Sequence, residues 1–437
     1  MVIRNIFFVV SVMPEQTPSA KTKLSIDRLG AMADGEGRVD GQLIYVPYTL
    51  PGEEVEIATN GSKPQLVNVV KPSPHRITPV CRHYQTCGGC ALQHLADEEV
   101  LRWKQEQVQT AFDREKVKVQ VQSCVPCHDR SRRRASFALS KTRNTVALGF
   151  HRKNSDEVVD IEQCPVLVSQ LESQFEPFKA VAATILRGDA PATLTVNMCD
   201  NGLDLDFQLA LAPTETMLAA FVKLFTKTGF CRASINSEII ASQTAPIIQK
   251  SGYEITPPPG GFLQAVEQAE QALGDKVSKH LASCKKVADL FSGCGTFSVR
   301  LAARSAVHAV EGQQTAIDAL KQAKPPAGNK PITCECRDLD SLPLTRQELK
   351  RFDGICLDPP RAGALPQIQQ IAKSDVKKIA YVSCNPKTLA RDVAVLVDAG
   401  FKLDLVQPVD QFKYSTHVEV VALISRAKSG KKRSIFG

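Results

Sequence analysis

After residue 257, apolar residues recur at the spacings expected of alternating strands and helices. Short apolar runs at 287–291, 308–311, 353–358 and 379–382 have the length of strands, and stretches with helical spacing follow them. Strands that alternate with helices are typical of an α/β sheet covered on both faces. The pattern therefore predicts a Rossmann-like α/β domain, closed by two more strands at 401–406 and 418–424.

One strand-to-helix turn in this region carries a reactive side chain. The run 379–382 is followed by Cys384, then by Asn385 as a helix cap and Pro386 at the first helical position, and Gly400 ends the helix. Ligands bind at this edge of open α/β sheets, and a thiol near a helix N-terminus tends toward thiolate. Cys384 is thus a candidate nucleophile, and a small buried core residue is the alternative.

The N-terminal half has different patterns. Residues about 22–75 contain short strands separated by Gly and Pro turns, which predicts a small β-barrel of the OB type. Residues 95–115 carry Val100, Trp103, Val108 and Phe112 on one side and predict an amphipathic helix.

Composition narrows the class of protein. The 437 residues predict two to four domains, and a net charge of +8 is compatible with a polyanionic partner. The 14 cysteines form no disulfide framework, which favours a reducing, cytoplasmic location. The apolar run 6–12 is too short to span a bilayer, and Met13 is an alternative start. We expect no membrane association.

Four cysteines have the pattern of an iron–sulfur site. Cys81, Cys87 and Cys90 lie within ten residues around two glycines, and Cys164 is followed by proline. The spacing differs from paired zinc-ribbon motifs, although zinc remains the alternative metal for these cysteines. Cys124 and Cys127 form a second pair, for which a structural role is favoured over a redox or metal-binding one.

A basic run precedes a predicted strand. Arg130 and the adjacent arginines 132–134 merge into an alternating apolar segment, and a second basic stretch follows Phe150. Arginines beside aromatic residues hold phosphates and stack on bases, so we expect RNA contacts here. A solvated edge that discourages strand pairing is the alternative.

The first strand of the C-terminal region ends in a glycine turn. The sequence Asp289-x-Phe-x-Gly-x-Gly-Thr296 looks like the S-adenosylmethionine loop of a class I methyltransferase, and Glu311 ends the next strand, where an acid takes ribose hydroxyls. The loop lacks both the G-x-G-x-x-G and the P-loop patterns. A dinucleotide-dependent dehydrogenase is the alternative.

Several motifs together resemble one enzyme family. The N-terminal Gly-Glu-Gly-Arg, Tyr-Val-Pro and Leu-Pro-Gly-Glu-Glu-Val segments look like a TRAM domain. Asp-Leu-Phe-x-Gly-x-Gly-Thr, Leu-Asp-Pro-Pro-Arg, Val-Ser-Cys-Asn-Pro and His-x-Glu follow in order. From about residue 22 onward, the chain is similar to the RNA uracil-C5 methyltransferases, and within them to bacterial 23S rRNA enzymes with a TRAM domain and an iron–sulfur cluster.

The resemblance implies roles for individual residues. It makes Cys384 the nucleophile and Glu419 the base, for which an ion pair with an arginine is the alternative role. The expected S-adenosylmethionine contacts are Gln264, Phe291, Gly293, Gly295, Thr296, Glu311, Asp338 and Asp358. The expected [4Fe–4S] ligands are Cys81, Cys87, Cys90 and Cys164, and the expected RNA contacts are Arg132, Arg133, Arg134 and Phe262. Thr296 and the pair Ala265-Val266 depart from the pattern of some relatives.

The resemblance also implies a domain plan and a reaction. We expect a tail at 1–21, a TRAM or OB-like barrel at 22–78, a central α+β iron–sulfur domain at 79–256 and a methyltransferase domain at 257–437. The expected reaction is C5 methylation of uracil in 23S rRNA by a monomer. Methylation of a tRNA uridine, N-methylation of an amino group, and a non-catalytic RNA-binding iron–sulfur protein are the alternatives. The sequence does not specify the target uridine.

Overall fold

The computed structural model describes residues 21–60, 63–143 and 145–426. The predicted tail at 1–21, with the alternative start at Met13, thus lies outside the described residues except for Lys21. The chain divides into two compact units, residues 1–76 and 77–437. The domain boundary predicted near residue 256 falls inside the second unit and stays a prediction.

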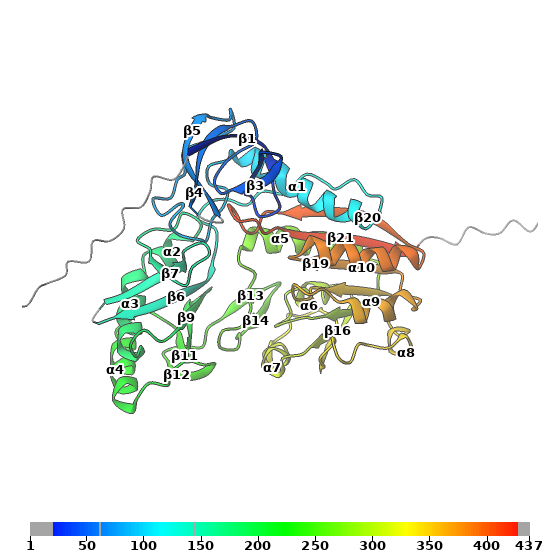
Figure 1. The fold of residues 1–437 in the computed structure, drawn as a ribbon. Coiled ribbons are helices and arrows are strands. Elements are labelled where there is room, and N and C mark those ends of the chain that lie inside the picture. Colours follow the sequence, from blue (N-terminus) through cyan, green and yellow to red (C-terminus); the bar gives the residue numbers. More distant parts are fainter. Residues whose placement is uncertain (1–20, 61–62, 144, 427–437) are drawn as a thin grey trace, which may run out of the picture. The chain divides into compact units, whose positions relative to one another are not determined.

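The first unit is an antiparallel sheet of five strands (Figure 1). Its order is β3-β2-β1-β4-β5, and the edge strands β3 and β5 contact each other, so the sheet curls. Glu53 lies buried beside it and accepts hydrogen bonds from Arg76 and from the amide of Leu50. The strands are β1 (Lys21–Leu29), β2 (Gly35–Val39), β3 (Gln42–Val46), β4 (Glu54–Asn60) and β5 (Lys63–Lys71).

The second unit begins with the cysteine segment and α1 (Asp97–Arg114), which confirms the helix predicted at 95–115. A seven-stranded sheet follows, in the order β12-β11-β10-β9-β6-β7-β8. Its strands are β6 (Arg134–Thr142), β7 (Thr145–His151), β8 (Val158–Asp160), β9 (Ala192–Cys199), β10 (Gly202–Leu209), β11 (Arg232–Ile235) and β12 (Glu238–Ser242). Its helices are α2 (Ser169–Glu172), α3 (Phe175–Ile185) and α4 (Glu215–Phe225).

A hairpin of β13 (Ile248–Lys250) and β14 (Tyr253–Ile255) leads to a second seven-stranded sheet. Its order is β17-β16-β15-β18-β19-β21-β20. The first five of these strands are parallel, and β21 is inserted antiparallel between β19 and β20. They are β15 (Lys286–Leu290), β16 (Ala306–Glu311), β17 (Ile332–Cys336), β18 (Gly354–Leu357), β19 (Lys378–Ser383), β20 (Phe401–Val409) and β21 (Glu419–Arg426). The sequence-based expectation of a Rossmann-like α/β sheet is confirmed.

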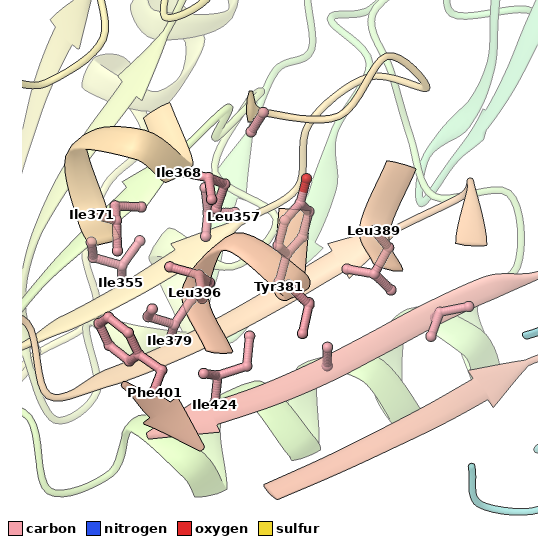
Figure 2. Packing of buried hydrophobic residues seen from close by; sticks show 14 of the residues in the cluster. Ile355, Leu357, Ile368, Ile371, Ile379, Tyr381, Leu389, Leu396, Phe401 and Ile424 are labelled. Atoms are coloured by element: carbon pink, nitrogen blue, oxygen red, sulfur yellow. The ribbon is translucent and has the colours of Figure 1, made fainter. Parts of the chain in front are cut away.

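Helices cover both faces of this sheet, because its strands are apolar on both sides. Ile379 and Tyr381 of β19 point toward α9 and α10, and they belong to one buried cluster with Leu389 and Leu396 of α10 (Figure 2). Ala380 and Val382 of the same strand pack in the core that contains α5. The helices are α5 (Glu267–Leu281), α6 (Ser298–Leu301), α7 (Gln314–Gln322), α8 (Arg346–Leu349), α9 (Leu365–Ala372) and α10 (Pro386–Asp398).

Helix α1 packs against α10 and extends one of these two cores. Val108 and Phe112 of α1 are fully buried in the cluster that also contains the sheet face under α10. The segment after the cysteines is therefore part of the core of the C-terminal sheet. Among the described helices, none combines the length and the apolar character needed to cross a membrane.

Candidate active site

The register of two neighbouring strands brings Cys384 and Glu419 together. Ser383 at the end of β19 pairs with Val420 of β21, so the next pair outward is Cys384 and Glu419. Both side chains line one cavity of about 540 Å³. Asp358, which directly follows the adjacent strand β18, lines the same cavity. Three predicted site residues thus meet at one edge of the sheet, as expected for this fold.

The turn after β19 holds the neighbouring loop in place. Asn385 caps α10 by accepting from the amide of Lys387, and its side-chain nitrogen donates to the carbonyl of Arg361 at 2.9 Å. Farther along α10, Asp392 accepts from the amide of Ala364 and from the hydroxyl of Tyr381. The cap and the helix therefore fix both the exit of β19 and the 358–364 loop.

The glycine turn after β15 forms another wall of the cavity. Phe291, Gly293 and Gly295 all have positive φ, at 59°, 55° and 93°. The φ of Gly295 is one that residues with a Cβ rarely adopt, and a Cβ there would also lie 2.6 Å from the end of the Leu320 side chain, so glycine is favoured. Phe291 is not a glycine, so its positive φ is a sterically disfavoured conformation in the wall of the cavity.

The acids at the ends of the next two strands lie beside this turn. Glu311, at the end of β16, accepts from the amide of Gly293 at 3.0 Å and from that of Gln313 at 2.9 Å. Asp338 follows β17 and lies exposed at the cavity, where hydrogen bonds from Ser341 and the Asp340 amide lower its pKa. Seven of the eight predicted cofactor contacts line the cavity, and Gly295 does not. The seven are Gln264, Phe291, Gly293, Thr296, Glu311, Asp338 and Asp358.

A chain of side-chain amides connects the acids near Cys384. Gln264 donates Nε2 to Asp358 Oδ2 at 3.3 Å, and its Oε1 accepts from Gln411 Nε2 at 2.9 Å. The same nitrogen of Gln411 lies 3.3 Å from Glu419 Oε2. Gln264, Gln411 and Glu419 are all at least 97% buried.

Burial and mutual repulsion disfavour negative charge at this edge. Burial and the carboxylate of Asp358 raise the pKa of Glu419 well above its usual value, and burial and Asp289 raise the pKa of Asp358 to about 7. Burial, Glu419 and Asp358 raise the pKa of the Cys384 thiol to about 11, and Arg361 acts in the opposite direction. The tendency toward thiolate expected from the helix N-terminus is therefore wrong for the ligand-free protein, because burial and nearby carboxylates outweigh the helix.

The predicted RNA contacts lie in two different environments. Arg134 stacks over the exposed ring of Phe262 at 5.4 Å, and Arg132 lies 5.9 Å from the ring of Phe412. Both rings line the cavity. Arg133 instead points into the protein, where Nη2 donates to Glu270 at 2.8 Å and Nε donates to the carbonyl of Gln264.

The four predicted cluster ligands line one separate cavity of about 60 Å³. These are Cys81, Cys87, Cys90 and Cys164, which come from two distant segments. Gly88 packs closely against the end of β7, since a Cβ there would lie 2.6 Å from the carbonyl of His151. Burial raises the pKa of Cys90 to about 12 and of Cys164 to about 11. Within the part of the chain that the structure describes, no three His, Cys, Asp or Glu side chains are grouped to hold a single metal ion.

Two residues near the site have no separate signal in the sequence. Gln411 and Phe412 lie in the connection between β20 and β21, which has no periodic pattern. Only their nearness to Glu419 in the chain, eight and seven positions before it, marks this segment.

The second cysteine pair lines neither of the two cavities. Cys124 and Cys127 are both buried, and burial and Asp410 raise the pKa of each thiol to about 12. Thiols that stay protonated and buried are unreactive. These properties favour the structural role expected from the sequence over a redox role.

Comparisons with known proteins agree with the site. Residues 334–427 match the model of the tRNA (Uracil-5-)-methyltransferase family. An uncharacterised RNA methyltransferase of Brucella suis is 40% identical, over 94% of this chain and all of its own. The 23S rRNA (uracil(1939)-C(5))-methyltransferase of Shewanella frigidimarina is 30% identical, over 95% of this chain and 98% of its own.

A solved structure has the same fold. It is a tRNA (uracil-54, C5)-methyltransferase of Pyrococcus abyssi in complex with S-adenosyl-L-homocysteine, with a TM-score of 0.70 and 23% identity. The match covers 92% of this chain and all of the other. With a relative at 30% identity aligned over nearly the whole of both chains, the protein belongs to the S-adenosylmethionine-dependent RNA uracil-C5 methyltransferase family.

Proposed function

We propose that this enzyme methylates C5 of a uracil in 23S rRNA to give 5-methyluridine, with Cys384 as nucleophile and Glu419 as base. The observation that carries the proposal is the strand register, which pairs Ser383 with Val420 and so brings the adjoining Cys384 and Glu419 to the lining of one cavity. A nucleophile and a proton acceptor are the two groups that this reaction needs from the protein.

The chemistry explains why both groups are required. Uracil C5 is too weak a nucleophile to take a methyl group unaided. Addition of the Cys384 thiolate to C6 turns C5 into an enolate carbon, which attacks the methyl group of the sulfonium and releases S-adenosylhomocysteine. Glu419 then removes the C5 proton, the C5=C6 double bond re-forms, and the C6–S bond breaks with its electron pair returning to sulfur.

The cofactor would occupy the part of the cavity beside the glycine turn. The proposed contacts are Gln264, Phe291, Gly293, Gly295, Thr296, Glu311, Asp338 and Asp358. Glu311 ends the second strand, where an acid suits ribose hydroxyls. Asp358 lies between this region and Cys384 in strand order, so its carboxylate suits the positively charged sulfonium and the uracil edge alike.

The RNA would reach the cavity past its aromatic rim. Phe262 is 57% exposed, and its ring and that of Phe412 each have an arginine beside them, Arg134 and Arg132. A target base must leave its stack to reach a recessed thiol, and such rings stack on unpaired bases. Arg133 would act indirectly by holding Gln264. The first unit is proposed as the TRAM-like RNA-binding domain of a cytoplasmic monomer.

Ribosomal RNA is preferred over tRNA as the substrate for one reason. The relative whose name specifies 23S rRNA aligns over 95% of this chain at 30% identity, whereas the tRNA enzyme of known structure is 23% identical. The family model is named for tRNA, so tRNA uridine is the second candidate.

We also propose a [4Fe–4S] cluster at Cys81, Cys87, Cys90 and Cys164. The support is that four thiols from two segments line one cavity, with Arg132 and Lys413 beside them. A [4Fe–4S] cubane binds one thiolate at each of its four irons, so its ligands lie farther apart than those around a single ion. The neighbouring cations suit the net negative charge of such a cluster. When bound, it would cross-link the segment before α1 to the central sheet.

The test uses RNA in which uridine is replaced by 5-fluorouridine. Fluorine cannot leave C5 as a cation, so the wild-type protein with S-adenosylmethionine should form a denaturant-stable, methylated RNA adduct. Cys384→Ser should form no adduct, and Glu419→Gln should form one even with ordinary uridine. Full turnover by Cys384→Ser would overturn the mechanism. Parallel assays on a 23S rRNA fragment and on unmodified tRNA decide the substrate.

A further inference from the structure

Gln411 is a buried amide that touches two site residues without lining the cavity. Only 1% of its surface is exposed, and its Nε2 donates to Gln264 Oε1 at 2.9 Å and lies 3.3 Å from Glu419 Oε2. We infer that Gln411 is a positioning residue that holds Glu419 ready for proton removal and links it to Asp358. This inference rests on the proposed role of Glu419 as the base.

The direction of the amide chain follows from its hydrogen-bonding groups. An ionised carboxylate only accepts, so Asp358 requires the nitrogen of Gln264 to face it, as it does at 3.3 Å. The oxygen of Gln264 is then left to accept a hydrogen bond from Gln411, which donates its side-chain nitrogen. The second hydrogen on that nitrogen faces Glu419. Ionised Asp358 therefore favours a donor directed at Glu419.

The backbone of Gln411 is held on both sides. The preceding Asp410 forms a buried ion pair with Lys104 of α1 at 2.5 Å, and Lys104 also donates to the carbonyl of Phe412 at 2.9 Å. In addition, the amide of Asp410 donates to the carbonyl of Val125 at 2.8 Å. With both neighbours fixed, the Gln411 side chain has little freedom to turn away from Glu419.

A donor at Glu419 Oε2 would matter in one step of the reaction. After methyl transfer, C5 carries both the methyl group and a hydrogen. The carboxylate of Glu419 takes that hydrogen as a proton, the C–H electron pair forms the C5=C6 bond, and the C6–S pair returns to Cys384. Gln411 stabilises the ionised form and leaves Oε1 of Glu419 for the proton. Methyl transfer itself does not need this contact.

The experiment compares Gln411→Leu with Gln407→Leu, using labelled S-adenosylmethionine and ordinary uridine-containing RNA. Gln407 is also buried and also donates its amide, to the carbonyl of Ser123, but it does not line the cavity. In Gln411→Leu, we expect the methylated covalent adduct to accumulate and its resolution to slow about tenfold. The pH profile of adduct resolution should move upward by about one unit, because Glu419 loses a donor that stabilises its ionised form.

The outcomes separate the two claims. If Gln411→Leu slows adduct formation and resolution equally, or if Gln407→Leu accumulates the same adduct, Gln411 has only a structural role and the inference is wrong. The inference is also wrong if Gln411→Leu loses more thermal stability than Gln407→Leu and accumulates no adduct. If Glu419→Gln itself traps no adduct, the proposed role of Glu419 as the base fails instead.

Discussion

Asn385 donates its side-chain nitrogen to the carbonyl of Arg361 at 2.9 Å, across the gap between two strand ends. The same side chain accepts from the amide of Lys387 and caps α10. One residue thereby connects the turn that carries Cys384 to the loop that follows Asp358.

Replacement of Asn385 by alanine should impair both stability and rate. Loss of the cap costs roughly 1 kcal/mol, which thermal unfolding measures. Loss of the Arg361 contact should lower kcat by about tenfold or more, because small displacements of reacting groups are costly. Asn385→Asp keeps the cap and loses the donor, so it should recover stability but not rate. Equal recovery of both would show that only the cap matters.

The Cys384 thiol should be unreactive until the cofactor binds. Burial and two carboxylates raise its pKa to about 11, so the thiolate fraction in the free enzyme should keep rising with pH up to that value. The sulfonium of S-adenosylmethionine carries a positive charge that favours the thiolate, whereas S-adenosylhomocysteine has none. We therefore expect iodoacetamide to modify Cys384 faster with the former bound, as measured by peptide mass spectrometry. Equal protection by both ligands would contradict this account.

Glu419→Gln should stabilise the fold at alkaline pH while abolishing turnover. The pKa of Glu419 is raised in the folded protein, so above its unfolded value near 4.5 the folded state retains a proton that the unfolded state loses. Wild-type stability thus falls as pH rises above 4.5, and the neutral glutamine removes that cost. We expect a measurable gain in the free energy of unfolding at pH 8 and about none at pH 4.

Chemical denaturation of both proteins at the two pH values measures that gain. Glu238→Gln is the control, because Glu238 is an exposed carboxylate on β12. A gain that is the same at pH 4 and pH 8 would show that ionisation is not its cause.

Removal of one cluster ligand should release the iron without unfolding the methyltransferase core. Anaerobically purified protein should contain about four irons per chain and absorb in the visible range. Cys164→Ser should lose both, and Cys336→Ser should lose neither, since Cys336 is an exposed cysteine on β17. One equivalent of zinc in the wild-type protein would replace the cluster assignment by a mononuclear site.

The strand-turn-helix around Cys384 could be predicted from the sequence because its signals are local. Asn385 and Pro386 begin α10, and the apolar run before them forms β19. The charge state of the thiol could not be predicted, since it depends on Glu419 and Asp358, which lie far away in the chain. The run of arginines predicts an RNA contact for Arg133 as for its neighbours, because the sequence does not show that Arg133 pairs with Glu270.

The chain of side-chain amides also could not be predicted from the sequence pattern. Gln411 lies in an irregular connection, and its partners Gln264 and Glu419 are brought to it by tertiary packing. Neither periodicity nor turn signals report on a side-chain hydrogen bond of that kind. The glycine turn and Glu311 could be predicted from the sequence, because a glycine turn after one strand and an acid at the end of the next strand recur in this type of sheet. In the structure, the amide of Gly293 in that turn donates to Glu311.

The antiparallel insertion of β21 between β19 and β20 has a consequence for biosynthesis. Glu419 is the first residue of that strand, and β21 is the last strand of the described chain. During translation, Cys384 emerges from the ribosome before Glu419, the proposed proton acceptor. Val420, Ala422 and Ile424 of β21 are buried in the core of the sheet, so a chain that ends before β21 lacks part of that core as well as Glu419. The residue proposed as the base is therefore delivered by the same strand that completes the sheet.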